Sequence, residues 1–212
     1  WGFILFARNI DTPDQLRALT ADLRDTVGRD APILIDQEGG RVSRLSSLGI
    51  DSPSARELAQ TKTPAQVRTL AASIGGQLKR LGITVDFAPD ADVSDESADE
   101  VIGDRSFSND PQVVTQYAGA FAAGLEDAGI MPVYKHFPGH GRASGDTHHQ
   151  LALTPPLGDP SGEVVAPVLL AVGVQRRLVH ATLRIKAGDQ RVAVDKEYVL
   201  ALDGLLLDGK GE

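Results

Sequence analysis

Short apolar runs alternate with longer amphipathic segments along the chain. The runs that predict strands are Gly2 to Phe6, Pro32 to Asp36, Thr84 to Ala88, Met131 to Phe137, Arg177 to Thr182 and Leu202 to Leu207. Between the first four runs, apolar residues recur at helical spacing, which predicts helices that include Leu16 to Val27, Val67 to Leu81 and Val113 to Leu125. Strands that alternate with helices in this way indicate parallel strands joined by crossover helices.

Each predicted helix has a start and a stop signal. A capping residue followed by proline opens them, at Thr12-Pro13, Thr63-Pro64 and Asp110-Pro111, and a glycine closes them, at Gly28, Gly82 and Gly129. Beyond Leu157 the apolar residues lose a clear period, so the pattern defines the end of the chain least well.

Composition and charge narrow the class of protein. The chain has 212 residues, 42% hydrophobic and 24% charged, which suits a single globular domain over residues 1–212. A net charge of -8 without a Lys/Arg block disfavours nucleic acid or an anionic membrane as partner. The absence of cysteine excludes disulfides, thiolate metal sites and cysteine nucleophiles.

No bilayer-spanning run and no signal peptide can be read from the given residues. No apolar run reaches the length needed to span a bilayer, so no transmembrane segment is predicted. The segment after Trp1 lacks the basic region and cleavage site of a signal peptide. Because the chain starts inside an apolar strand, we expect that residues precede Trp1.

Polar residues gather where the predicted strands end. They are Arg8 and Asn9, Asp36, Asp90 and Asp92, Lys135 and His136, and His180. In a (β/α) barrel the carboxyl ends of the strands converge on one face, where active sites are built. The sequence therefore predicts an α/β protein with a TIM-like (β/α) barrel, incomplete as written because six candidate strands are fewer than the eight of a closed barrel.

Four of the five histidines cluster in one glycine-rich segment, at His136, His140, His148 and His149. Asp146 precedes His148 by two residues, and a carboxylate that bonds one imidazole nitrogen makes the other a better general acid or base. His140 and His149 fit a buried, hydrogen-bonded role equally well. A zinc site of His136, His140, His148 and Asp146 is disfavoured because these residues lack a helical HExxH frame, so no metal is predicted.

These residues belong to blocks that resemble, in order, the glycoside hydrolase family 3 β-N-acetylhexosaminidases of the bacterial NagZ type. The blocks are Gly2 to Asn9, Ile35 to Val42, Phe87 to Pro89, Val101 to Phe107 and Lys135 to His148, and the resemblance covers residues 2 to 157. It implies a TIM-like barrel that removes terminal β-linked N-acetylglucosamine, typically from peptidoglycan fragments, by a retaining double displacement without metal or cofactor.

The resemblance also implies roles for the matching residues. His148 would be the acid/base with Asp146 as its orienting partner, and the sugar would be bound by Asp36, Arg44, Arg105, Lys135 and His136. Sugar hydroxyls need both kinds of partner, and Asp36 accepts hydrogen bonds while the cationic residues donate them. Two structural alternatives stay open, namely Asp36 as an ion-pair partner of Arg41 or Arg44, and a buried Asp104–Arg105 pair. Glu38 is expected to orient a neighbouring base.

A retaining mechanism also needs a carboxylate nucleophile. In the family this is an aspartate after a later apolar strand, commonly in a Thr-Asp-Asp context. Asp208 lies nearest to that register, one position off and without the flanking residues. It fits a polar chain terminus equally well.

Three functions follow from these observations. The leading hypothesis is a β-N-acetylhexosaminidase whose partner is a small or oligosaccharide substrate containing N-acetylglucosamine. A β-N-acetylglucosaminide phosphorylase is an alternative, because a histidine acid/base leaves room for phosphate as the attacking group. The other is a catalytically degenerate sugar-binding homologue that keeps Asp36, Arg105 and Lys135. Similar family members occur in the cytoplasm and as envelope lipoproteins, so the compartment stays open.

Overall fold

The main element is a sheet whose first four strands run parallel. The computed structural model describes residues 2–95, 100–137, 139–141, 152–153, 193–194 and 198–201. The sheet has the order β1-β2-β5-β6-β9, with β1 (Phe3–Leu5), β2 (Ile33–Ile35), β5 (Val85–Asp86), β6 (Met131–Phe137) and β9 (Tyr198–Ala201). The pairs β1–β2, β2–β5 and β5–β6 are parallel. Strands that pair in sequence order in this way are the repeating units of a (β/α) barrel.

Three long helices connect the parallel strands and begin and end at the predicted signals. They are α1 (Pro13–Val27), α3 (Pro64–Arg80) and α4 (Pro111–Asp127). The side chains of Thr12, Thr63 and Asp110 each accept a hydrogen bond from a backbone N–H of the first turn. Gly28 ends α1 in the left-handed conformation, with φ of 64°. The predicted helices are therefore confirmed.

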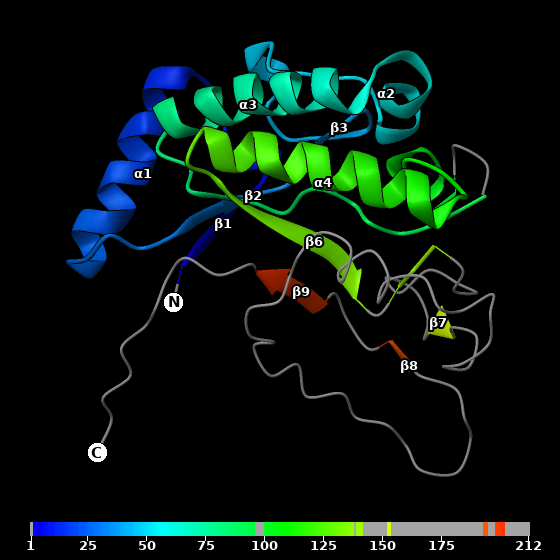
Figure 1. The fold of residues 1–212 in the computed structure, drawn as a ribbon. Helices are drawn as coiled ribbons and strands as arrows, with labels where there is room; N and C mark the ends of the chain where they lie inside the picture. Colours follow the sequence, from blue (N-terminus) through cyan, green and yellow to red (C-terminus); the bar gives the residue numbers. More distant parts are fainter. Residues whose placement is uncertain are drawn as a thin grey trace.

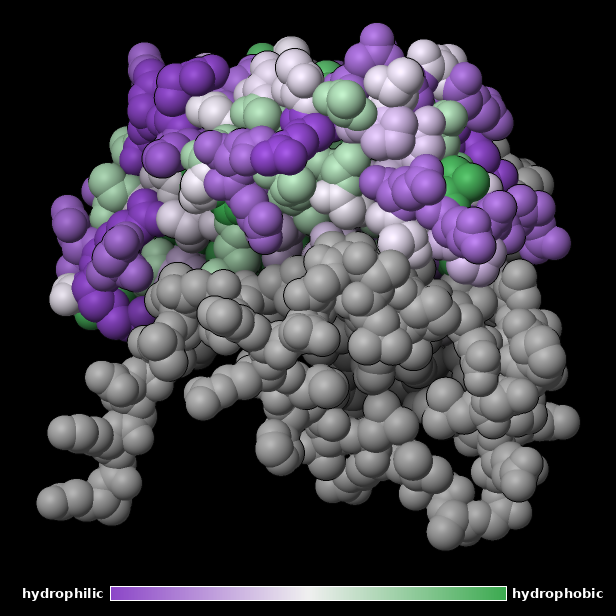
Figure 2. All heavy atoms as spheres, in the orientation of Figure 1, coloured by the Kyte–Doolittle hydropathy of each residue, from purple (hydrophilic) through white to green (hydrophobic). Residues whose placement is uncertain are grey.

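The two faces of the sheet contact different sets of apolar residues. Ile33 and Ile35 of β2 belong to the large core that also holds the apolar side of α1, α3 and α4, and Figure 1 shows α3 and α4 lying side by side over the sheet. Leu34, which points the other way, packs with Val85 and Val133. This alternation follows from the two-residue period of a strand. The outer surface of the helices is mainly hydrophilic in Figure 2, which agrees with their amphipathic pattern.

Several short elements were not predicted. A hairpin of β3 (Gln37–Gly39) and β4 (Val42–Ser43) follows β2, and α2 (Ala55–Thr61) precedes α3. Three 3-10 turns also occur: η1 (Ala7–Asn9), η2 (Ser46–Leu48) and η3 (Gly103–Arg105). The hairpin turn needs glycine, because Gly39 has φ of 98° and a Cβ there would lie 2.2 Å from the Ser52 hydroxyl oxygen.

The fifth strand of the sheet departs from the parallel pattern. β9 pairs antiparallel with β6, with Val133 opposite Ala201 and Tyr134 opposite Leu200. The free edge of β6 presents backbone N–H and C=O groups that an extended segment can satisfy in either direction. A separate antiparallel pair joins β7 (Ala152–Leu153) and β8 (Ala193–Val194). The strands predicted at 177–182 and 202–207 lie outside the described residues.

Among the residues that the structure describes, no helix has the length and apolar character needed to cross a membrane. Large exposed hydrophobic side chains in this part of the chain are confined to Ile4 and Val27.

Candidate active site

The polar residues that follow β2 and β5 meet the end of β6 where the parallel strands end, at the carboxyl edge of the sheet. A parallel bridge joins Asp90 to Lys135, and the backbone N–H of Ala91 donates to the carbonyl of Lys135 over 2.7 Å. Asp36 and Glu38 reach the same edge from the end of β2 and from β3. The site is therefore built where the carboxyl ends of parallel strands converge, as the sequence predicts.

Lys135 lies between two carboxylates. Its ammonium nitrogen Nζ is 2.8 Å from Oδ1 of Asp36 and 2.5 Å from Oε1 of Glu38, and only 5% of its side chain is exposed. Burial opposes the charged form of Lys135, but Glu38 and Asp36 outweigh it and raise the pKa. Burial alone would likewise raise the pKa of Glu38, and the charges of Lys135 and Arg105 lower it to about 2 instead. Both groups are thus held in their charged forms.

Arg105, from η3, joins this pair to His136. Its Nε and Nη2 atoms each donate to a carboxylate oxygen of Glu38 over 2.9 Å, a bidentate contact with well-defined geometry. Nη2 also lies 3.2 Å from Nε2 of His136. Because a guanidinium can only donate, this contact requires Nε2 to accept.

His136 is bound on its other side by Asp92. Nδ1 of the ring lies 2.6 Å from Oδ2 of Asp92. Burial opposes a charged imidazole, while Asp92 and Asp90 raise the pKa of His136. The acceptor role of Nε2 toward Arg105 nevertheless assigns the neutral tautomer with its proton on Nδ1. Both ring nitrogens of His136 are therefore engaged by protein groups.

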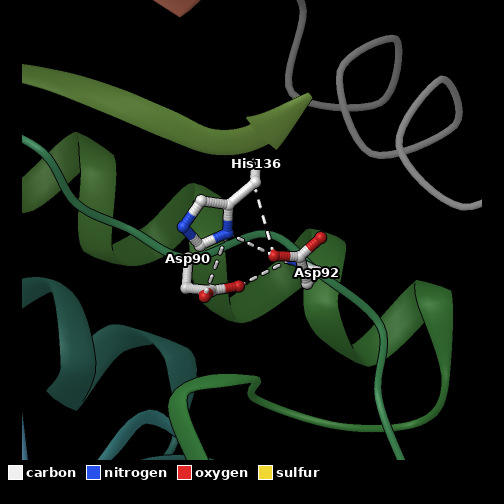
Figure 3. A group of neighbouring side chains, drawn as sticks. All are labelled: Asp90, Asp92 and His136. Atoms are coloured by element: carbon white, nitrogen blue, oxygen red, sulfur yellow. Dashed lines mark hydrogen bonds and ion pairs between the residues drawn. The ribbon is translucent and has the colours of Figure 1, made fainter. Parts of the chain in front are cut away.

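Asp90 and Asp92 form a buried carboxyl pair beneath this ring (Figure 3). Burial would raise the pKa of Asp92, but His136 and the backbone N–H of His140 lower it to about 2. For Asp90, burial and the neighbouring charge of Asp92 raise the pKa to about 8. Near neutral pH the pair thus holds one proton, on Asp90.

The predicted sugar-binding residues come together in the structure. Arg44 completes the group, with Nη2 3.8 Å from Oδ2 of Asp36 and side-chain exposures of 32% and 19%, respectively. Of the structural alternatives for Asp36, the contact with Arg44 is present, together with the closer one to Lys135. The remaining candidates, Asp146, His148 and Asp208, lie outside the described residues, as does His149.

One structural alternative is wrong. Within the described part of the chain, Asp104 and Arg105 pair with other residues: Asp104 accepts from Arg41 over 3.1 Å, and Arg105 pairs with Glu38. Adjacent residues of a 3-10 turn point in different directions, which separates the two side chains. Of the buried, hydrogen-bonded role weighed for His140, the burial is confirmed, since this residue is 6% exposed; its backbone N–H donates to Oδ1 of Asp92.

Three carboxylic acids of this site were not among the predicted site residues. The sequence pattern places Asp90 and Asp92 after a strand without a role, and predicts for Glu38 only the orientation of a neighbouring base. The available signal was spacing: in extended backbone, residues two apart share a face, so Asp92 accompanies Asp90 and Glu38 accompanies Asp36.

Asp90, Asp92 and His136 also carry the side-chain types that bind metal ions. Within the described part of the chain, Asp90, Asp92 and His136 offer ligand atoms that all lie within 4.8 Å of one another. Both ring nitrogens of His136 are already engaged, Nδ1 by Asp92 over 2.6 Å and Nε2 by Arg105 over 3.2 Å. The Arg105 guanidinium, 3.7 Å from Asp90, would also repel a cation. We therefore assign these residues to a hydrogen-bonded network.

Comparison with known proteins agrees with this architecture. The chain is 61% identical over 136 residues to the beta-hexosaminidase LpqI of Mycobacterium tuberculosis, a match that covers 64% of this chain and 35% of that protein. The solved LpqI structure has a TM-score of 0.66 and 44% identity, with 82% of this chain and 57% of that chain covered. NagZ from Neisseria gonorrhoeae in complex with N-trifluoroacetyl-D-glucosamine has a TM-score of 0.70 and 32% identity, with 78% and 50% covered.

These matches bear on both extent and fold. The chain spans about a third of the length of LpqI and about half of the solved NagZ chain. They confirm the α/β, TIM-like barrel fold, incomplete in this chain, that the sequence predicts. The model of the glycosyl hydrolase family 3 N-terminal domain matches residues 2–161, and the chain therefore belongs to glycosyl hydrolase family 3.

Proposed function

We propose that the protein is a retaining β-N-acetylhexosaminidase that removes terminal β-linked N-acetylglucosamine from glycosides such as peptidoglycan fragments. The observation that carries the proposal is the charged cluster of Asp36, Lys135, Arg105 and His136 at the carboxyl edge of the parallel sheet. The name beta-hexosaminidase of LpqI and the N-trifluoroacetyl-D-glucosamine complex of NagZ support the same substrate class.

The cluster suits a neutral, hydroxyl-rich ligand. Asp36 and Arg44 are partly exposed at its rim, while Lys135 and Glu38 lie beneath them with exposures of 5% and 6%. The Lys135 ammonium fixes the Asp36 carboxylate, whose free lone pairs can accept from two sugar hydroxyls. Because these charges are already paired, a neutral sugar adds hydrogen bonds without leaving a buried charge uncompensated.

The catalytic groups are proposed from the family resemblance. In the first step the Asp208 carboxylate attacks the anomeric carbon, and His148, oriented by Asp146, gives its proton to the departing glycosidic oxygen. In the second step His148 takes a proton from water, whose oxygen attacks the anomeric carbon and releases the Asp208 carboxylate. The anomeric configuration is thereby retained, and both residues return to their starting states.

The acid/base role is tested with His148→Ala and an aryl N-acetyl-β-glucosaminide. We expect turnover to fall by about 10²–10⁴-fold, the usual contribution of a positioned acid/base. His149→Ala is the matched control, because it removes the adjacent imidazole and should keep most of the activity. Equal turnover of wild type and His148→Ala would overturn the assignment.

The nucleophile is tested separately. A fluorinated substrate analogue should form a stable glycosyl-enzyme with the wild type, and Asp208→Asn should abolish the labelling seen by mass spectrometry. Labelling that persists in Asp208→Asn would assign the nucleophile to another carboxylate.

Two other functions are outcomes of the same assays. Turnover that accelerates with inorganic phosphate and yields a sugar 1-phosphate would identify a phosphorylase. Calorimetric binding of N-acetylglucosamine without turnover would identify a degenerate sugar-binding homologue.

A further inference from the structure

We propose that Asp90 is a positioning residue of the sugar site: by remaining a neutral carboxylic acid beside His136 and Arg105, it leaves the imidazole bonded to Asp92 and the guanidinium bonded to Glu38, in the arrangement that meets the sugar. This inference rests on the proposed sugar-binding function. Asp90 itself is 2% exposed and contacts other protein groups, so its role is to place the residues around it.

The carboxyl group of Asp90 accepts a hydrogen bond at one oxygen, while its other oxygen has no hydrogen-bond partner in the described part of the chain. Oδ1 accepts the backbone N–H of Asp92 over 2.8 Å. Oδ2 lies 3.7 Å from Nη2 of Arg105 and 3.7 Å from Nδ1 of His136. Figure 3 shows Asp90 and Asp92 on the same side of the His136 ring. Asp90 thus lies next to both the imidazole and the guanidinium without a hydrogen bond to either.

The proton of the carboxyl pair belongs on Asp90. Both carboxyl groups are buried and close to each other, so they cannot both be ionised. Asp92 has several donors, because it accepts from Nδ1 and the backbone N–H of His136 and from the backbone N–H of His140. Oδ1 of Asp90 accepts the N–H of Asp92. The carboxylate with more donors keeps its charge, which leaves the neutral acid to Asp90.

The charged and titratable groups around Asp90 and its neighbour Asp92 come from every element packed against them. They are Arg105 from η3, Glu38 from β3, Lys135 and His136 from β6, Asp92 from the same loop, and His140 from residues 139–141. Glu38 and Asp36 already engage Lys135, and Glu38 also engages Arg105. The cationic side chains of Arg105 and Lys135 are thus already paired with carboxylates other than Asp90 and Asp92.

Ionisation of Asp90 should therefore rearrange the site. The new carboxylate would draw Arg105 away from Glu38, or would favour a second proton on His136. A proton on Nε2 of His136 would face the donor atom Nη2 of Arg105, which lies 3.2 Å away, and that contact would break. In either case the imidazole and the guanidinium lose the orientation that the sugar meets.

The test compares wild type with Asp90→Asn, because the amide keeps the shape of the neutral acid and cannot ionise. The dissociation constant of N-acetylglucosamine is measured by calorimetry at pH 6 and pH 9. Since burial and Asp92 raise the pKa of Asp90 to about 8, we expect the ratio of the two constants to be about tenfold in the wild type and close to one in Asp90→Asn. Asp127→Asn, which removes an exposed carboxylate, is the control that should keep the wild-type ratio.

The ratio separates positioning from a purely structural role. A structural defect weakens binding by the same factor at both pH values, whereas loss of the titrating acid removes the pH dependence. A wild-type ratio in folded Asp90→Asn would overturn the proposal.

A second measurement needs no variant at position 90 and no sugar. The ring ¹⁵N signals of His136, assigned by comparison with His136→Asn, are followed from pH 6 to pH 10. We expect an inflection near pH 8 from the ionisation of Asp90. Its absence would overturn the proposal even if Asp90→Asn fails to fold. A wild type that binds no sugar would refute the proposed function, while the ¹⁵N titration would still decide the role of Asp90.

Discussion

Oδ2 of Asp92 lies 2.6 Å from Nδ1 of His136. Both side chains are buried: that of Asp92, which follows β5, is 0% exposed, and that of His136, in β6, is 6% exposed. The contact fixes the ring tautomer and leaves Nε2 as the acceptor for Arg105. Asp92 therefore connects the carboxyl pair to the rest of the cluster.

Asp92→Asn should lower the free energy of unfolding by about 1.5–3 kcal/mol, the usual contribution of a hydrogen bond to a charged group. The amide would lose the charge that supports His136 and would accept less strongly from the backbone N–H of His140. Urea denaturation measures the change. Asp127→Asn removes an exposed partner of Arg68 and should have a much smaller effect. Similar losses in the two variants would contradict the account.

Acid should destabilise the fold through Glu38. Against the opposing effect of burial, Lys135 and Arg105 lower the pKa of Glu38 from 4.5 to about 2. A lowered folded-state pKa stabilises the fold above pH 4.5, and this stabilisation is lost as the pH falls toward 2. The linked free energy is up to about 3 kcal/mol.

Glu38→Gln should therefore show a smaller loss of stability between pH 6 and pH 3 than the wild type. Urea titrations at the two pH values provide the comparison. An unchanged difference would mean that Glu38 is not held as a carboxylate by Lys135 and Arg105.

Close packing of α3 against α4 leaves no room for a side chain at Gly124. A Cβ at Gly124 would lie 2.3 Å from the carbonyl oxygen of Arg68 and 2.7 Å from Cβ of Ala71. Gly124→Ala should therefore destabilise the protein by about 1–3 kcal/mol through overpacking. Gly76→Ala on α3 is the matched control, because the nearest atom to its Cβ would be 3.7 Å away. Gly76→Ala should stabilise the protein by about 0.5–1 kcal/mol. Thermal denaturation measures both variants, and shifts of the same sign in the two would contradict the expectation.

Local signals made the helices and the parallel strands predictable. Thr12, Thr63 and Asp110 act within one turn of the helix that each begins, so the sequence nearby suffices to place the start. The direction of β9 could not be predicted, because it depends on which distant segment reaches the free edge of β6.

The sequence predicts which residues belong to the site better than it predicts which of them contact each other. Asp36, Arg105, Lys135 and His136 were expected at strand ends and lie together. Their partners could not be read from spacing, since Arg105 and Glu38 are 67 positions apart and Lys135 and Asp36 are 99 apart. The protonation of Asp90 is even harder to predict from the sequence, because it results from burial next to Asp92 rather than from either residue type.

The most direct test of the central claim is a crystal structure of the full chain with bound N-acetylglucosamine. The account predicts that the sugar lies at the carboxyl edge of the parallel sheet, with hydroxyl groups bonded to Asp36, Lys135 and Arg105. A sugar that binds elsewhere, with these three side chains still paired only to protein groups, would contradict it.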